Sequence, residues 1–118
     1  MGTPYEPDPP LSESLIAAAL TDLSVRLKVL LHERLEKLVL YGSRARGDYD
    51  PESDVDVAII VKDLDRDLKL KIFDLVADIE LEYLVPLSTL VLSYSAFTDL
   101  LTRERLIALD IEGEGIPL

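Results

Sequence analysis

The chain has 118 residues, 48% of them hydrophobic and 30% charged, which suits one compact domain with a core of its own. It contains no cysteine, which excludes disulfides and thiolate metal sites, and its 23 acidic and 12 basic residues give a formal net charge of -11. This balance argues against a nucleic-acid partner, because a phosphate backbone would repel the domain; a basic protein, or a nucleotide that arrives with its own metal ion, suits it better.

The N-terminal end of the chain differs in composition from the remainder. Residues 1–10 contain four of the seven prolines and are predicted to form a flexible tail, with residues 11–118 as the domain. No basic-then-apolar signal pattern is present, and the apolar runs are far shorter than the roughly 20 residues that span a membrane. We therefore expect a cytoplasmic protein without a membrane partner.

The first predicted elements are a helix and a strand. Ser12 or Ser14 can cap a helix that runs to about Leu35, in which apolar residues recur at three- and four-residue spacing. The short apolar run Leu38–Tyr41 then predicts a buried strand, which ends at Gly42.

A polar loop with Gly47, Asp50 and Pro51 as turn residues leads to a second strand. Val55–Val61 is β-branched and apolar apart from Asp56, which is typical of a strand buried on both faces.

The remaining predicted elements alternate between helix and strand. Residues 64–84 are predicted to be helical up to the stop at Pro86, Leu87–Leu92 to be a third strand, and residues 95–112 to form one or two helices. Two glycines are natural stops for the last helix: Gly113 and Gly115. This order predicts an α/β (α+β) domain, a small mixed sheet with helices packed against it.

A glycine and a serine follow the first predicted strand, where the chain must turn sharply. Gly42 would let the backbone approach a phosphate closely, and Ser43 adds a hydroxyl donor. A helical turn that begins at Ser43 would direct its N-terminal amides at the same anion. Alone, Gly-Ser after a strand is a weak signal and usually marks an ordinary turn.

Two carboxylates stand at the start of the second predicted strand. Asp54 and Asp56 are two residues apart, so an extended backbone projects both from one face. Such a pair repels itself unless a hard cation or solvent reaches it, and Mg²⁺ prefers one or two carboxylates with phosphate oxygens and water. A buried salt bridge or a helix cap is the alternative, since Asp-x-Asp recurs elsewhere in this acidic chain. Asp56 differs because it lies within an apolar run, where an unpaired carboxylate is costly.

Two arginines lie between these features. Arg46 suits a triphosphate and a structural role equally, because it can also neutralise nearby acids; for Arg44 we favour the structural role. Tyr41 is expected to belong to the core or to a pocket wall.

Together these residues resemble a known family. Leu38 to Asp48, read as Leu-Val-Leu-Tyr-Gly-Ser-Arg-Ala-Arg-Gly-Asp, and then Ser53-Asp54-Val55-Asp56-Val57-Ala58, resemble the minimal nucleotidyltransferases of the polymerase-beta superfamily. That family's signature is Gly-Ser, about ten residues, and Asp-x-Asp. The similarity is strongest over residues 36–62, and the ending Asp110 to Ile116 also looks like the family.

The resemblance implies roles for these residues. Gly42 and Ser43 would hold the nucleotide phosphates, and Asp54 and Asp56 would bind Mg²⁺ or Mn²⁺. Such proteins are commonly paired with a small helical HEPN protein as a toxin and antitoxin, and some transfer AMP from ATP to a tyrosine of that partner.

The third predicted strand departs from the family. Active relatives usually have a third carboxylate there; our alignment places Leu90 at that position, and no Asp or Glu occurs between Pro86 and Thr98. Glu80 or Glu82 would substitute only if the strand began earlier than predicted.

The sequence thus leaves three functions open. The first is Mg²⁺-dependent transfer of AMP to a protein hydroxyl. The second is a weakly catalytic or inactive fold that neutralises a HEPN partner by contact. The third is transfer to a small molecule, which is disfavoured because enzymes of that type usually add a substrate-binding domain. Homo-oligomer formation stays possible.

Overall fold

The computed structural model describes residues 13–47 and 54–118, so the predicted tail, Ser12, Asp50 and Pro51 lie outside the described residues. The described elements, in chain order, are α1 (Glu13–Leu31), the 3-10 helix η1 (His32–Arg34), β1 (Leu35–Tyr41), α2 (Ser43–Arg46), β2 (Val55–Val61), α3 (Arg66–Tyr83), β3 (Leu87–Ser93), α4 (Tyr94–Thr102), α5 (Leu106–Glu114) and β4 (Ile116–Pro117).

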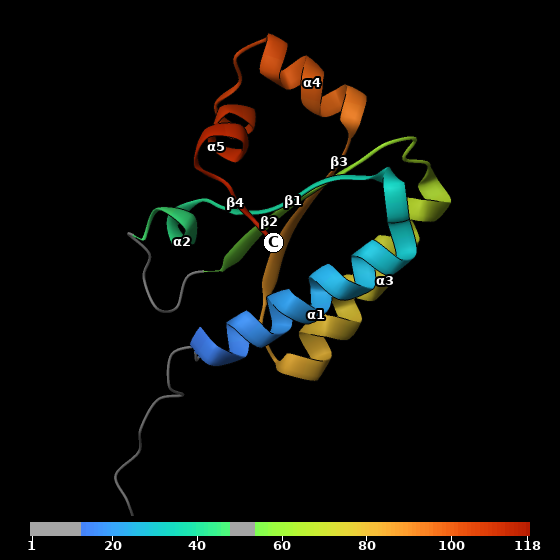
Figure 1. The fold of residues 1–118 in the computed structure, drawn as a ribbon, viewed down its shortest axis with the longest axis vertical. Coiled ribbons are helices and arrows are strands. Elements are labelled where there is room, and N and C mark those ends of the chain that lie inside the picture. Colours follow the sequence, from blue (N-terminus) through green and yellow to red (C-terminus); the bar gives the residue numbers. More distant parts are fainter. Residues whose placement is uncertain (1–12, 48–53) are drawn as a thin grey trace, which may run out of the picture.

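The strands form one mixed sheet with the order β3-β2-β1-β4. β1 pairs antiparallel with both β2 and β4, whereas β2 and β3 are parallel and are joined by α3 (Figure 1). The prediction of a small mixed sheet with helices packed against it is confirmed.

Helices cover both faces of the sheet. On one face, α1 and α3 pack on the β2 residues Val55, Val57, Ile59 and Val61. On the other face α4 and α5 pack on Ala58 and Ile60 through three side chains: Phe97, Ala108 and Ile111 (Figure 1). β2 is therefore buried from both sides, and Asp56 alone among its residues is not fully buried.

The first helix is shorter than predicted. α1 ends at Leu31 rather than near Leu35, because His32 adopts a left-handed conformation with φ 49° and a 3-10 turn follows. Leu35 then pairs with Val61, so β1 begins three residues before the predicted Leu38.

The boundaries around α3 and β3 agree closely with prediction. The Asp65 side chain caps α3 by accepting a hydrogen bond from the Leu68 amide at 2.8 Å. Leu84 ends the helix with φ 54°, and β3 begins at Leu87. The length and apolar character needed to cross a membrane are met by none of the described helices.

The end of the chain differs from prediction. Gly113 lies inside α5 and does not stop it; Gly115 follows as the residue after the helix. Ile116 and Pro117 then pair with Leu40 and Val39 as the unpredicted strand β4. Gly115 permits this turn because a methyl group there would clash with the Ile111 carbonyl oxygen and lie 3.2 Å from the Val39 side chain.

The two glycines at the end of α5 should respond oppositely to alanine. We expect Gly115→Ala to lower the free energy of unfolding by about 1–3 kcal/mol, because the added methyl forces β4 away from β1. Gly113→Ala meets nothing within 4 Å and should raise it by up to about 1 kcal/mol, because alanine favours the helix. Urea unfolding followed by circular dichroism measures both values; equal midpoints would contradict this account of the C-terminal turn.

Candidate functional site

The loop after β1 has the conformation that only glycine adopts freely. Gly42 has φ 76° and ψ -155°, and the one-turn helix α2 begins directly at Ser43. The Gly42 and Ser43 carbonyls accept hydrogen bonds from the amides of Arg46 (3.2 Å) and Gly47 (2.9 Å). A helical turn thus begins at Ser43. Such a turn is required for the first amides of the helix to face an anion.

Gly42 lies against Asp56. A Cβ atom added to Gly42 would stand 2.6 Å from the Asp56 Oδ2 atom, closer than any real side chain tolerates. β1 and β2 create this approach, because Tyr41 is paired with Asp56. The structure therefore brings the predicted glycine loop and the predicted carboxylate into direct contact.

The two predicted carboxylates interact. Asp54 is exposed immediately before β2, and Asp56 is partly buried within it. The pKa of Asp56 is raised, mainly by burial and further by the negative charge of Asp54; a Ser88 hydrogen bond and the charges of Arg44 and Arg46 act in the opposite direction. A cation bound by this pair would offset the repulsion between the two carboxylates.

The third strand brings serine to this site. In the parallel register of β2 and β3, Asp56 is next to Ser88, and Ala58 is next to Leu90. The Ser88 hydroxyl donates a hydrogen bond to the Asp56 carboxylate. Leu90, which the alignment places at the family's third-carboxylate position, lies two residues further along β3 and packs in the apolar cluster between the sheet and α4 and α5.

Glu80 and Glu82 do not replace a third acid. Both lie on α3, where Glu80 accepts a hydrogen bond from the Leu87 amide at 3.1 Å and Glu82 pairs with Arg26 at 2.6 Å. Within residues 13–47 and 54–118, no group of three or more His, Cys, Asp or Glu side chains is placed to hold a metal ion. Asp48 and Asp50 are outside those ranges.

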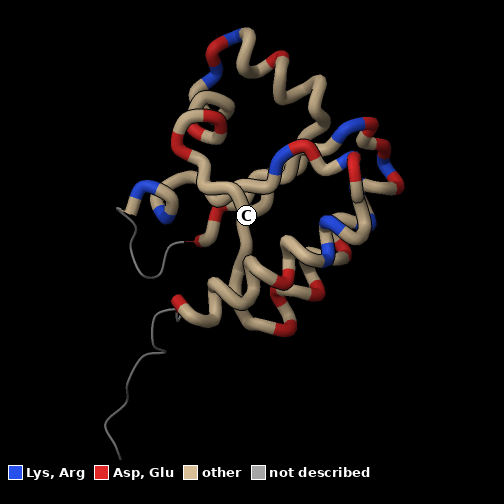
Figure 2. Tube along the Cα trace, viewed as in Figure 1, with Lys and Arg blue, Asp and Glu red and all other residues tan. Residues whose placement is uncertain are grey.

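The arginines of α2 link the loop to the C-terminal part of the chain. Arg46 Nη1 lies 3.4 Å from Glu114 Oε2 at the end of α5, and both arginines act on Asp56 through their charge. These basic residues stand beside the acidic end of β2 (Figure 2). Sequence reasoning missed Glu114, because it is 68 positions away and only the fold of α5 brings it near Arg46.

Tyr41 forms part of the surroundings of the site. It is half-buried at the end of β1, and burial, followed by the nearby Asp56 charge, raises the pKa of its hydroxyl. It packs against the cluster beneath α4 and α5, as expected for a residue of the core or of a pocket wall.

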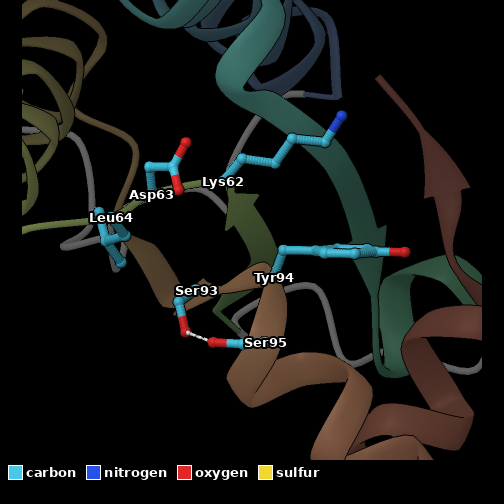
Figure 3. Close-up of a pocket in the computed structure, with 6 residues that line it drawn as sticks. All are labelled: Lys62, Asp63, Leu64, Ser93, Tyr94 and Ser95. Atoms are coloured by element: carbon cyan, nitrogen blue, oxygen red, sulfur yellow. Dashed lines mark hydrogen bonds between the residues drawn. The ribbon is translucent and has the colours of Figure 1, made fainter.

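A separate cavity of about 380 Å³ lies at the opposite end of β2 and β3. Its lining includes Lys62, Tyr94, and Ser93 and Ser95, whose hydroxyls are 3.2 Å apart (Figure 3). Five residues of β2, residues 57–61, lie between Asp56 and the cavity residue Lys62, about 20 Å along an extended strand. None of the predicted site residues lines it.

Comparison with known proteins agrees with this arrangement. Residues 26–109 match the family described as polymerase beta, nucleotidyltransferase, a span that includes β1, α2, β2, α3 and β3. The chain belongs to this family.

Two relatives of this nucleotidyltransferase come from Methanocaldococcus jannaschii, and both are provisionally named protein adenylyltransferase. One is 53% identical over 38 residues, which span 32% of this chain and 38% of the relative. The other is 41% identical over 71 residues, which span 60% of this chain and 67% of the relative. Membership of this family supports nucleotidyl transfer as the class of reaction.

Among solved structures, a provisionally named nucleotidyltransferase from Sulfolobus solfataricus aligns over 91% of this chain and 87% of its own. The sequence identity is 19% and the TM-score is 0.41.

Removing the Asp56 charge should stabilise the metal-free domain. The folded-state pKa of Asp56 lies above its ordinary value of 3.8, so the folded state binds this proton more tightly than the unfolded state does. The contribution of Asp56 to stability therefore falls as pH rises through this pKa. Asp56→Asn should raise the melting temperature at pH 7 in EDTA, and the difference should shrink as the pH falls toward 4. A variant less stable than the wild type at pH 7 would contradict this sign.

A double-mutant cycle can isolate the contact between Gly42 and Asp56. Gly42 and Gly47 both have positive φ, but a Cβ at Gly47 meets nothing within 4 Å. We expect Gly47→Ala to cost about 1 kcal/mol of unfolding free energy, and Gly42→Ala at least about 2 kcal/mol. In an Asp56→Ala background the Gly42→Ala cost should fall, because the clashing carboxylate is gone. An unchanged cost, measured by urea unfolding, would show that the backbone conformation alone requires Gly42.

Proposed function

We propose that this nucleotidyltransferase transfers a nucleoside monophosphate, AMP from ATP, to a hydroxyl group of a protein partner. The observation that supports this most directly is the convergence of Gly42, Asp54 and Asp56 at one end of the sheet, with the Gly42 backbone against the Asp56 carboxylate. The names of the two M. jannaschii relatives favour a protein as the acceptor and adenylate as the transferred group.

The donor set fits a divalent cation. Asp54 and Asp56 would hold Mg²⁺ or Mn²⁺, because both offer hard carboxylate oxygens and their mutual repulsion favours a cation between them. When bound, such an ion would neutralise phosphate charge and stabilise the negative charge that develops on the leaving pyrophosphate.

The other residues would position the nucleotide. Gly42 and Ser43 would contact the phosphates through backbone amides and the serine hydroxyl. Arg46 would add positive charge from its position at the end of α2, where Glu114 holds it at 3.4 Å. In the reaction, an acceptor hydroxyl oxygen forms a bond to the α-phosphorus, the bond from that phosphorus to pyrophosphate breaks, and the acceptor proton passes to solvent or a carboxylate.

We further propose a HEPN-domain protein as the acceptor and binding partner, with this chain as the antitoxin of the pair. The motif over Leu38 to Ala58 supports this through its resemblance to that type of protein. The net charge of -11 supports a partner with a basic surface.

Ser88 favours a second candidate function, neutralisation of the partner by binding with weak or absent catalysis. Ser88 occupies the position next to Asp56 on β3, and a neutral hydroxyl binds a divalent ion more weakly than a carboxylate does. Loss of one acidic ligand should weaken nucleotide transfer more than nucleotide binding.

Calorimetric titration of ATP with Mg²⁺ should detect binding to the wild type, and Asp54→Ala/Asp56→Ala should abolish it, because the phosphates then lack their cation. The control Asp67→Ala/Asp99→Ala removes the same charge from exposed positions on α3 and α4 and should bind as the wild type does. Loss of binding in both double variants would refute the assignment of the site.

α-labelled ATP, incubated with a co-purified HEPN partner, then separates the two functions. Label on the partner supports transfer. Neutralisation without label that is unaffected by the acid double variant supports binding alone.

Ser88→Asp tests whether the lack of a carboxylate at position 88 weakens metal binding. If it does, this variant should bind Mn²⁺ more tightly than the wild type. Unchanged Mn²⁺ affinity would mean that this position does not limit metal binding.

A further inference from the structure

Glu114 is the last residue of α5, and its carboxylate lies beside an arginine of the candidate site. Its Oε2 atom is 3.4 Å from Nη1 of Arg46, the last residue of α2. α2 and α5 come together where β4 joins β1 (Figure 1). The guanidinium group that we assign to the nucleotide phosphates therefore has a carboxylate partner within the chain itself.

The pairing of β4 with β1 brings Glu114 to the glycine loop. Ile116 pairs with Leu40 in the antiparallel register. Glu114 precedes Ile116 by two residues, and Gly42 follows Leu40 by two residues. Because antiparallel strands run in opposite directions, Glu114 and Gly42 come to the same end of the pair. The main chain of β4 therefore holds Glu114 near the start of α2.

The ion pair contributes little to the stability of the fold. The Arg46 and Glu114 side chains are 40% and 47% exposed, and water screens the attraction between charges at such positions. Phosphate oxygens are stronger partners for arginine, because they can accept two parallel hydrogen bonds from the fork of the guanidinium group. A triphosphate can therefore displace this carboxylate, but the displacement lowers its net affinity.

We propose that Glu114 withholds Arg46 from nucleotides, as an autoinhibitory contact that a triphosphate must break before Arg46 can bind it. The proposal rests on the nucleotide site proposed above and adds a competing anion from the chain itself. Glu114 engages Nη1, which belongs to the fork that a phosphate would use. The contact therefore weakens nucleotide binding through Arg46 and leaves the acid pair at the start of β2 unchanged.

α5 also provides a matched control. Glu112 has the same charge and nearly the same side-chain exposure as Glu114, 50% against 47%, and it pairs with Lys37 at 3.1 Å. The two glutamates are two residues apart, so the helix directs them about 200° from each other. Lys37 lies five residues before Gly42, about 16 Å along an extended strand. That distance exceeds the range of about 8 Å over which charges act at physiological salt.

Calorimetric titration of ATP with Mg²⁺ into the full chain, at about 0.15 M ionic strength, tests the competition. Glu114→Gln should bind ATP about two- to fivefold more tightly than the wild type, which is the gain expected from removing one exposed ion pair. Glu112→Gln should bind as the wild type does, and both variants should keep the wild-type circular dichroism spectrum. No gain in Glu114→Gln, or an equal gain in Glu112→Gln, overturns the proposal.

A double-mutant cycle tests whether Glu114 acts through Arg46. In an Arg46→Gln background, Glu114→Gln should change the ATP affinity no more than Glu112→Gln does, because the contact is already absent. A gain that persists without Arg46 would mean that Glu114 repels the phosphates directly, and it would overturn the autoinhibitory contact.

The same titrations separate this proposal from the proposed function. Equal ATP affinities of the wild type and Glu114→Gln, with binding that still requires Asp54 and Asp56, would contradict the autoinhibitory contact alone. Absence of binding in both the wild type and Glu114→Gln would contradict the nucleotide site and the contact together. Binding by Glu114→Gln alone would support both.

Discussion

The contact between the Gly42 backbone and the Asp56 carboxylate is the constraint on which the site depends. β1 and β2 are antiparallel and pair Tyr41 with Asp56, so the residue after Tyr41 must turn beside that carboxylate. A side chain at position 42 would reach within 2.6 Å of it. Glycine, with its positive φ, permits the turn and starts α2 immediately afterwards. The position of Ser43, Arg44 and Arg46 beside the acids follows from that one turn.

The rest of β2 allows a charged residue to be held there. Val55, Val57 and Ile59 are fully buried against α1 and α3, and Ala58 and Ile60 against α4 and α5. This burial fixes the strand on both faces and offsets the cost of Asp56, whose raised pKa shows that its ionised form is disfavoured. A rigid central strand thus positions Asp56, whereas Asp54, two residues earlier, is exposed to solvent.

Features encoded locally were predictable from the sequence, and features that depend on distant pairing were not. The strand Val55–Val61 and the turn at Gly42-Ser43 are each encoded by a few consecutive residues, so local patterns predict them. Ser88 became the neighbour of Asp56 only through the parallel register of β2 and β3, which no local pattern specifies. The ion pair between Arg46 and Glu114 joins residues 68 positions apart, and β4 exists only because β1 has a free edge. The left-handed His32 at the end of α1 likewise has no sequence signal, since histidine is tolerated inside helices.

The two faces of the sheet differ in their relation to the site. Side chains alternate along β2, so Asp56 projects on the same face as Ala58 and Ile60, the face of α4 and α5. α3 packs on the opposite face through Val55 and its alternate neighbours. Neither α1 nor α3 therefore covers the face on which Asp56 projects. Access to Asp56 would instead be limited by the C-terminal segment, because Glu114 holds Arg46 and β4 pairs with Leu40, two residues before Gly42.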